Sequence, residues 1–99
     1  MNTYKSMSDF EINKLVANKL GLFVVAVAQD GIIVSGKSLS IDYCNNPSDA
    51  WPIVVENKIG IKHFNRGSWQ AHCQGDEVVH DENPLRAAMT VYLMMGDNS

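Results

Sequence analysis

The sequence predicts one α+β domain whose helices and strands follow the order α-ββ-α-βββ-α. Two Asn-Pro pairs, Asn46-Pro47 and Asn83-Pro84, each precede an amphipathic run. Asn can cap the free N–H groups of a helix and Pro fits its first position, so each pair predicts a helix start. Short apolar runs separated by Gly-containing turns predict hairpins. Strands joined in this way form an antiparallel sheet, with helices packed on its faces.

The first half of the chain is expected to form one helix and one hairpin. Ser8 and Glu11 make a capping box, apolar residues then follow at helical spacing, and Gly21 ends the helix. Residues 22–28 are rich in Val and predict a strand, and residues 32–35 predict the returning strand. The Asp-Gly pair between them is a hairpin turn signal.

The second half is expected to form a helix, a three-stranded meander and a final helix. The second helix covers residues 47–57, with an apolar stripe made of Ala50, Trp51, Val54 and Val55. Turn sequences separate three strand candidates, at residues 60–64, 68–73 and 77–80. The last helix begins at Pro84 and ends near Gly96.

Length and charge narrow the class of protein. At 99 residues the chain is expected to form a single domain, residues 1–99, with flexible tails over residues 1–7 and 97–99. The net charge of −3 and the scattered basic residues argue against duplex nucleic acid as a partner. The longest apolar run, residues 20–28, is too short to span a membrane, and we expect a cytoplasmic protein with no signal peptide.

The sequence predicts neither a metal site nor a catalytic centre. Zinc ligands converge at fixed short spacing, whereas the candidates here fall mostly in adjacent pairs that point to opposite faces of a strand: His63, His72, Cys73, His80 and Asp81. Cys44 precedes a helix start but has no orienting partner, so we interpret both cysteines as reduced packing side chains. The acidic pairs at 76–77 and 81–82 are typical of solvated turns. We expect no enzyme activity and no cofactor.

The segment around the second helix start holds the candidate ligand site. A helix N-terminus offers free N–H groups and partial positive charge to an anion, and aromatic side chains can stack on a base. We predict a ligand-binding site made of Tyr43, Asn45, Asn46, Ser48, Trp51, Arg66 and Arg86. Lys37 is a further candidate counter-charge. The alternative stays open that Asn46 only caps the helix while Tyr43 and Trp51 only fill the core.

Three separated blocks keep their order along nearly the whole chain: residues 8–14 (SDFEINK), 43–52 (YCNNPSDAWP) and 83–89 (NPLRAAM). Together they resemble the small phage NinX-like proteins, which lie within or close to a wider group called the phage ABA-sandwich domain. The resemblance implies layers on both faces of a sheet, a phage or prophage origin, an infected bacterium as the setting and an accessory role. It supplies no catalytic residues, and residues 22–40 match no motif of the family.

We therefore expect a non-enzymatic accessory protein that acts by binding either a small molecule or another protein. By analogy with other small phage anti-defence proteins, the favoured hypothesis is a sponge that sequesters a nucleotide-derived ligand. The alternative is a module that inhibits or redirects a host or phage protein, with Tyr92, Met94 and Met95 as candidates for an exposed apolar patch. A chain this small also favours self-association, so we expect a homo-oligomer.

Overall fold

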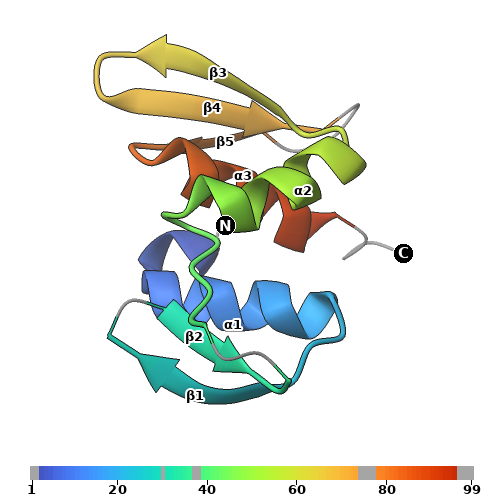
Figure 1. Ribbon diagram of the computed structural model, residues 1–99. Helices are drawn as coiled ribbons and strands as arrows, with labels where there is room; N and C mark the ends of the chain where they lie inside the picture. The colour runs from blue at the N-terminus through green and yellow to red at the C-terminus, as the bar shows by residue number, and fades with distance from the viewer. Residues whose placement is uncertain (1–2, 30, 37–38, 74–77, 96–99) are drawn as a thin grey trace.

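The computed structural model describes residues 3–29, 31–36, 39–73 and 78–95, and its elements follow the predicted order (Figure 1). The helices are a one-turn 3-10 helix η1 (Thr3–Ser6) and the α-helices α1 (Asp9–Lys19), α2 (Pro47–Glu56) and α3 (Pro84–Met94). The strands are β1 (Val24–Ala28), β2 (Gly31–Val34), β3 (Gly60–Asn65), β4 (Ser68–His72) and β5 (Val78–Asp81). The predicted α+β class is confirmed.

All pairs of neighbouring strands are antiparallel, as predicted, and they form two sheets. β1 pairs with β2, while β3, β4 and β5 form a meander. At Ile32, the free edge of β2 is occupied by the chain that leads to α2. There the backbones of Ile32 and Ile41 exchange N–H···O hydrogen bonds of 2.8 and 2.7 Å. This connection and α2 separate the hairpin from the meander, so the single predicted sheet is divided in two.

The helices lie between the two sheets (Figure 1). α1 packs on the β1–β2 hairpin, α3 packs on the meander, and α1 and α3 also contact each other. α2 packs against α3. α3 is therefore the central element, and all its residues from 86 to 93 are buried. The expected packing of helices against sheet faces is present, with one sheet on either side of the helical layer.

The first predicted helix begins and ends where the sequence signals place it. Ser8 Oγ accepts a hydrogen bond from the Glu11 N–H at 3.2 Å, and Glu11 Oε1 accepts one from the Ser8 N–H at 3.0 Å. These two bonds satisfy backbone donors that would otherwise lack a partner. Gly21 follows the last turn of α1 with a φ of +83°, the left-handed conformation that favours glycine after a helix.

Both Asn-Pro pairs are helix starts, as predicted. Asn46 Oδ1 accepts from the Ser48 N–H at 3.0 Å. Asn83 Oδ1 accepts from the N–H groups of Leu85 and Arg86, at 2.9 and 3.2 Å. In both helices the following Pro occupies a first-turn position, where its missing N–H leaves no hydrogen bond unmade.

The start of the chain contains a short helical turn that the sequence analysis did not predict. Thr3–Ser6 form η1, and the Arg86 side chain donates hydrogen bonds to the carbonyl oxygens of Tyr4 and Met7. A distant arginine therefore contacts this turn, and the flexibility expected for residues 1–7 stays a prediction. Several expectations lie outside the described residues: those for Asp30, Lys37, the turn at 74–76, the acidic pair at 76–77, the stop at Gly96 and the tail at 97–99.

The buried stripe of α2 differs from the predicted one at two positions. The buried residues are Ala50, Ile53 and Val54, while Trp51 and Val55 are each 57% exposed. Residues 50, 53 and 54 follow the i, i+3, i+4 spacing of a single helix face, which packs against the protein interior. Trp51 and Val55 belong to the outer face of α2, one turn apart.

Candidate functional site

Polar side chains from all three sequence blocks meet in one network, which we call the polar joint. It is defined by Asp9, Asn13, Asp42, Asn45, Asn83 and Arg86. These residues come from the first two turns of α1, from the start of α3 with its cap, and from the segment just before α2. Each of them makes at least one hydrogen bond to another member of the network.

The deepest member of the polar joint is Asn13, whose side chain is fully buried. Its Nδ2 donates to Asp42 Oδ1 at 3.0 Å, and its Oδ1 accepts from the Cys44 N–H at 3.1 Å. A buried amide that lacks such partners costs about 1–3 kcal/mol, so this pair of bonds favours one arrangement of α1 against the chain before α2.

Asn45 is engaged through both ends of its amide. Its Nδ2 donates to Asp9 Oδ2 and Asp42 Oδ2, each at 3.0 Å, and its Oδ1 accepts from Asn83 Nδ2 at 3.0 Å. Asn83 Nδ2 also donates to the Cys44 carbonyl at 2.6 Å. A ligand that used the Asn45 amide would have to displace bonds that tie α1 to α3.

All three guanidinium nitrogens of Arg86 contact oxygen atoms of the protein. It lies 9% exposed on α3, with Nη1 2.6 Å from Asp9 Oδ1 and Nε 3.2 Å from Asp81 Oδ2. Its Nη2 donates to two backbone carbonyls of the N-terminal turn, those of Tyr4 and Met7. The charge is therefore compensated within the fold, and it closes the polar joint on the side of η1.

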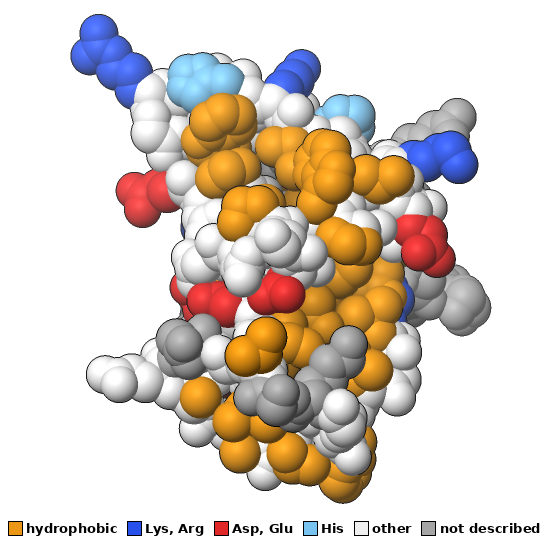
Figure 2. Space-filling model, viewed as in Figure 1, with side chains coloured by type: hydrophobic (Ala, Val, Ile, Leu, Met, Phe, Trp, Pro, Cys, Tyr) orange, Lys and Arg blue, Asp and Glu red, His pale blue; other side chains and the backbone are white. Residues whose placement is uncertain are grey.

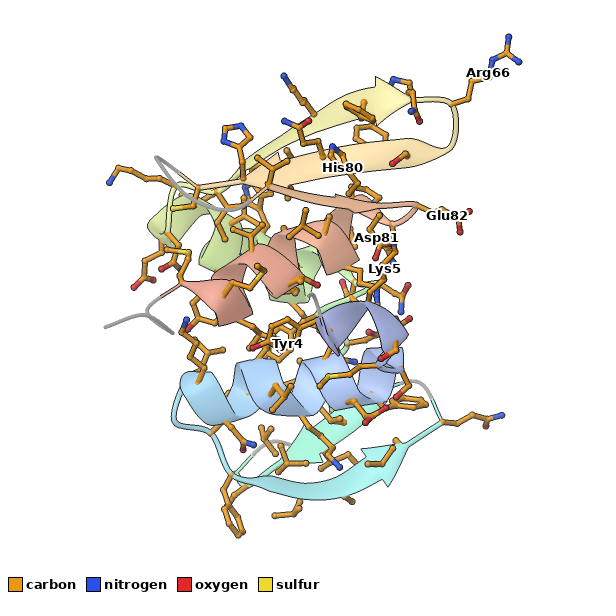
Figure 3. All side chains as sticks on the ribbon, turned by 180° about the vertical axis from the view of Figure 1, so that it is seen from behind. Tyr4, Lys5, Arg66, His80, Asp81 and Glu82 are labelled. Atoms are coloured by element: carbon orange, nitrogen blue, oxygen red, sulfur yellow. The ribbon has the colours of Figure 1, made fainter. Side chains whose placement is uncertain are left out.

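A polar groove of about 530 Å³ lies beside Arg86, on the face opposite to the view of Figure 1. Its lining includes Lys5, Ser68, His80 and Glu82. Figure 3 shows Lys5 near Asp81 and Glu82, with His80 on β5, the strand that ends at Asp81. His80 Nε2 lies 3.2 Å from Gln70 Oε1, and its ring packs against the Phe64 ring. The groove thus mixes both signs of charge without an excess of cations.

Cys44 is a packing side chain, as the sequence suggests. It is fully buried, and burial, reinforced by the charge of Asp9, raises the pKa of its thiol to about 12. At neutral pH the thiol stays protonated, and the protonated form is a poor nucleophile. Its position just before the helix start therefore does not activate it.

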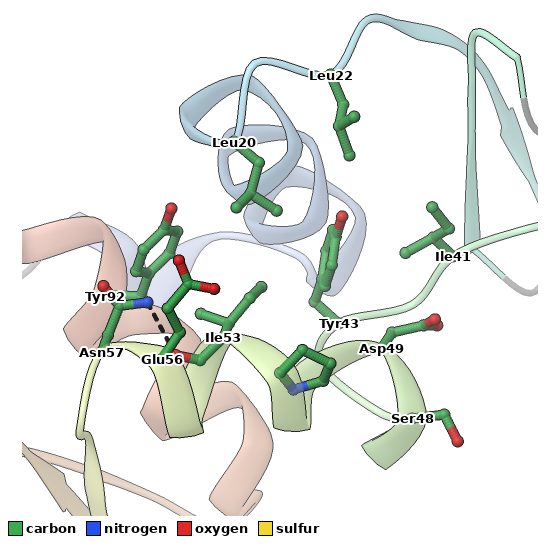
Figure 4. A pocket seen from close by; sticks show the side chains of 11 residues that line it. Leu20, Leu22, Ile41, Tyr43, Ser48, Asp49, Ile53, Glu56, Asn57 and Tyr92 are labelled. Atoms are coloured by element: carbon green, nitrogen blue, oxygen red, sulfur yellow. Dashed lines mark hydrogen bonds between the residues drawn. The ribbon is translucent and has the colours of Figure 1, made fainter.

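A cavity of about 370 Å³ lies beside the predicted segment, between the end of α1, α2 and α3 (Figure 4). We call it the α2 cavity. Its lining residues are Leu20, Leu22, Ile41, Tyr43, Ser48, Asp49, Pro52, Ile53, Glu56, Asn57 and Tyr92. Figure 4 shows Tyr43 and Tyr92 on either side of Glu56 and Ile53. Apolar side chains from α2, from the chain just after α1 and from the connection to α2 form the walls between the polar groups.

The α2 cavity has an acidic and hydroxylic character. Asp49 and Glu56 supply carboxylates, and Asp49 Oδ2 also accepts from the Asp42 N–H at 2.9 Å. Burial is the main cause that raises the pKa of Tyr43, followed by the charge of Asp49. The pKa of Tyr92 is raised by burial and then by Glu56. Both phenols are neutral at physiological pH, so they can donate hydrogen bonds.

The seven predicted site residues do not lie together in the structure. Tyr43 and Ser48 line the α2 cavity, and Asn46 caps the helix that forms its floor. Asn45 and Arg86 belong to the polar joint, as described above. Trp51 lies on the outer face of α2, and Figure 3 shows Arg66 projecting from the β3–β4 turn, away from the helices. Whether any of them binds a ligand stays a prediction.

Sequence reasoning missed several residues of the α2 cavity, above all Glu56 and Tyr92. One signal was available for Glu56: it follows Asp49 by seven residues, two helical turns, which places both carboxylates on one face of α2. Tyr92 gave no such signal, because it reaches the cavity from α3, far along the chain. It is 7% exposed, while Met94 and Met95 pack partly buried against the core, so these three do not form the expected exposed patch.

Two kinds of feature, a metal site and a membrane-spanning helix, are not found among the described residues. Within them, no three side chains of His, Cys, Asp or Glu gather closely enough to hold a metal ion. No helix in the described ranges has the length and apolar character needed to cross a membrane.

Comparison with protein families gives one result. The family model described as "Bacteriophage P22, NinX" matches residues 3–96, nearly the whole chain. No curated protein sequence matches the chain. The chain therefore belongs to the bacteriophage P22 NinX family and is a phage accessory protein, as the three sequence blocks suggested.

Proposed function

We propose that this member of the P22 NinX family is a binding protein whose α2 cavity holds a small nucleoside-like ligand and sequesters it unchanged. The observation that carries the proposal is the cavity of about 370 Å³, in which two phenols and two carboxylates face apolar walls. This volume falls within the roughly 300–1,000 Å³ that is usual for small-ligand pockets.

The lining favours a ligand that donates hydrogen bonds. The carboxylates of Asp49 and Glu56 accept from hydroxyl or amino groups, and the phenols of Tyr43 and Tyr92 can donate as well as accept. Ile53, Leu20 and the tyrosine rings offer apolar surface to a planar ring. A nucleoside combines these features, because it carries a flat base, amino groups and two or three sugar hydroxyls.

The same chemistry disfavours a phosphate inside the α2 cavity. None of the described residues that line it is Lys, Arg or His. A nearby cation, Lys19, lies over the Tyr92 ring with Nζ 4.4 Å from its centroid and already donates to the carbonyls of Tyr92 and Met95. A phosphate beside Asp49 and Glu56 would meet like charge. The proposal thus narrows the predicted nucleotide-derived ligand to one whose nucleoside part enters the cavity while any phosphate stays outside.

A protein partner is the second candidate, and one observation favours it. Trp51 and Val55 are each 57% exposed and lie one turn apart on the outer face of α2. Exposed aromatic and aliphatic side chains at i and i+4 are typical anchors for a helix that docks into a groove. This surface differs from the α2 cavity, so variants can separate the two functions.

The experiment is a titration of the protein with adenosine and, separately, with adenosine monophosphate, followed by NMR chemical shifts and calorimetry. The two probes differ only in the phosphate. We expect adenosine to bind with shifts centred on α2 and Tyr92, and the monophosphate to bind at least about tenfold more weakly, since tenfold corresponds to about 1.4 kcal/mol. Recovered adenosine should be chemically unchanged.

Three results would count against the proposal. Equal or tighter binding of the monophosphate would mean that cations outside the α2 cavity determine recognition. Absence of shifts for both probes at millimolar concentration would remove nucleosides as the ligand class. A hydrolysed or otherwise altered product would replace sequestration by catalysis.

A further inference from the structure

The meander formed by β3, β4 and β5 has one face in the core and one face open to solvent. Ala71 and its cross-strand partner Val79 are buried on the face that α3 covers. Consecutive residues of a strand point to opposite faces, so the neighbouring cross-strand row, Lys62–Gln70–His80, lies on the other side. The residues of this other side, which we call the open face, are Lys62, Phe64, Gln70, His72, Val78 and His80.

Two rings pack together on the open face. The register of β3 against β4 shifts between His63 and Asn65, which places a bulge at Phe64. A bulge re-aims a side chain, and the Phe64 ring packs against the His80 ring with 4.2 Å between the ring centroids. Phe64 is still 51% exposed, so its ring keeps surface that a partner can contact.

A third ring lies over β3. His72 pairs with Gly60, and a side-chain carbon added at Gly60 would come within 2.5 Å of His72 Nε2 and 2.8 Å of its Cε1. Any residue with a Cβ would therefore displace the imidazole, and glycine leaves room for it against the sheet. The open face thus presents three planar rings on one surface: Phe64, His72 and His80.

The meander is the basic part of an acidic protein. Residues 57–75 contain no Asp or Glu, although the whole chain carries a net charge of −3. They contain three exposed cations: Lys58, Lys62 and Arg66. Figure 2 shows Lys, Arg and His side chains along the upper margin of the view, over the meander, with Asp and Glu side chains lower down. Asp81 and Glu82, at the end of β5, line the polar groove, and the acidic pair at 76–77 lies outside the described residues.

We propose that the open face of the meander is a docking surface for a single-stranded nucleic acid. Unpaired bases stack on exposed aromatic and imidazole rings, largely independently of sequence, and cations beside the rings attract the phosphates. Lys62 and Arg66 supply that charge, and Phe64 is the most accessible stacking ring. A duplex keeps its base faces inside the stack, and an acidic protein segment would match the charge but not the rings. No residue of β3, β4 or β5 lines the α2 cavity, so this inference does not depend on the proposed ligand.

The test measures the fluorescence anisotropy of labelled single strands of thymidine and of uridine, each about ten nucleotides long, a usual site size for one domain. We expect at least one strand to bind with a dissociation constant on the order of 100 μM at about 20 mM salt. If Lys62 and Arg66 each neutralise one phosphate, the logarithm of the association constant should fall with the logarithm of salt concentration with a slope of about −1.4. A duplex and a polyglutamate chain of similar length should bind at least about tenfold more weakly.

Two pairs of matched variants separate stacking from charge. Phe64→Ala should weaken strand binding about tenfold, whereas Phe23→Ala, which removes a phenylalanine that is 73% exposed outside the meander, should leave it unchanged. Lys62→Gln should reduce the magnitude of the salt slope by about 0.7, whereas Lys14→Gln, at an exposed lysine of α1, should not.

Thermal melting shows whether each variant is folded. If Phe64→Ala melts well below the unmodified protein, Phe64→Leu serves in its place, because it keeps apolar bulk at the bulge and removes the ring, while Phe64→Tyr should retain binding. The proposal is overturned if neither strand binds at protein concentrations up to about 1 mM, far above the expected dissociation constant. Polyglutamate or duplex binding as tight as strand binding also overturns it, as does full strand binding in a folded variant that lacks the ring. Adenosine affinity that is unchanged in Phe64→Ala keeps the two proposals separate.

Discussion

The polar joint and the α2 cavity meet at Tyr43–Asn45, yet they use their polar side chains in opposite ways. In the polar joint, the amide of Asn45 and the guanidinium of Arg86 are engaged by other parts of the chain. In the α2 cavity, the phenol hydroxyls of Tyr43 and Tyr92 and the Glu56 carboxylate have no hydrogen-bond partner among the described residues. The polar joint holds the helices in place, whereas the polar groups of the α2 cavity face solvent and can bind a ligand.

The comparison shows that a specific motif need not mark a binding site. The block around Asn45-Asn46-Pro47 is distinctive because three structural requirements coincide there: a helix cap, a proline start and an amide that links α1 to α3. Ligand recognition, if it follows the proposal, uses residues with weaker sequence signals, such as Glu56. The predictions below separate the two regions by stability and by binding.

The largest expected effect is on stability, from Arg86→Ala. Removing the guanidinium leaves the Asp9 and Asp81 carboxylates without their counter-charge and releases η1. The free energy of unfolding should fall by about 3 kcal/mol, the low end for a buried pair, because the Asp9 side chain is 41% exposed. Urea denaturation measures this. Arg66→Ala is the matched control, since that arginine is exposed on the β3–β4 turn and its loss should change stability by less than about 0.5 kcal/mol. Equal effects of the two substitutions would contradict the role of Arg86 in the polar joint.

The two Asn-Pro helix starts offer a comparison within one chain. Asn46→Ala removes a cap and should cost about 1 kcal/mol. Asn83→Ala removes a cap together with the bonds from Asn83 Nδ2 to Cys44 and Asn45, and should cost about 2–3 kcal/mol. Equilibrium unfolding of both variants under the same conditions gives the difference. If Asn46→Ala proves as costly as Asn83→Ala, the polar joint does not add to ordinary capping.

A smaller effect concerns alkaline pH. The folded pKa of Cys44, about 12, lies above its ordinary value of 9.0, so the unfolded chain loses this proton first as pH rises. Stability from this group is complete below about pH 9 and is lost between pH 9 and 12, by roughly 1 kcal/mol at pH 10. Cys44→Ala should flatten this part of the pH profile of unfolding, and Cys73→Ser should not. An unchanged slope in Cys44→Ala would assign the pH dependence to other groups.

Most of the fold could be predicted from the sequence because its signals are local. A capping box, two Asn-Pro starts and turn residues each act within a few positions, and they located the helices and strands to within about two residues. The division into two sheets could not be predicted, because it depends on the pairing of Ile32 with Ile41. The 3-10 turn at residues 3–6 depends on Arg86, about eighty residues away.

The candidate site was less predictable than the fold, because its residues meet through contacts between distant parts of the sequence. Tyr43 and Ser48 were identified from the helix start, and both line the α2 cavity. Asn45 and Arg86 carry the right chemistry for a ligand, but their partner Asp9 comes from α1, at separations that no local pattern encodes. Tyr92 reaches the cavity only because α3 packs against α2.

The polar joint is assigned to stability and the α2 cavity to ligand binding. The most direct test of this assignment measures adenosine affinity and unfolding free energy for Glu56→Gln and Asn45→Ala. Glu56 is exposed on α2, so Glu56→Gln should leave stability within about 0.5 kcal/mol while it weakens adenosine binding by roughly tenfold to a hundredfold. Asn45→Ala should lower stability by about 1 kcal/mol and leave the affinity of the folded protein unchanged. The opposite pattern, with affinity lost in Asn45→Ala and retained in Glu56→Gln, would place ligand recognition in the polar joint and contradict the account.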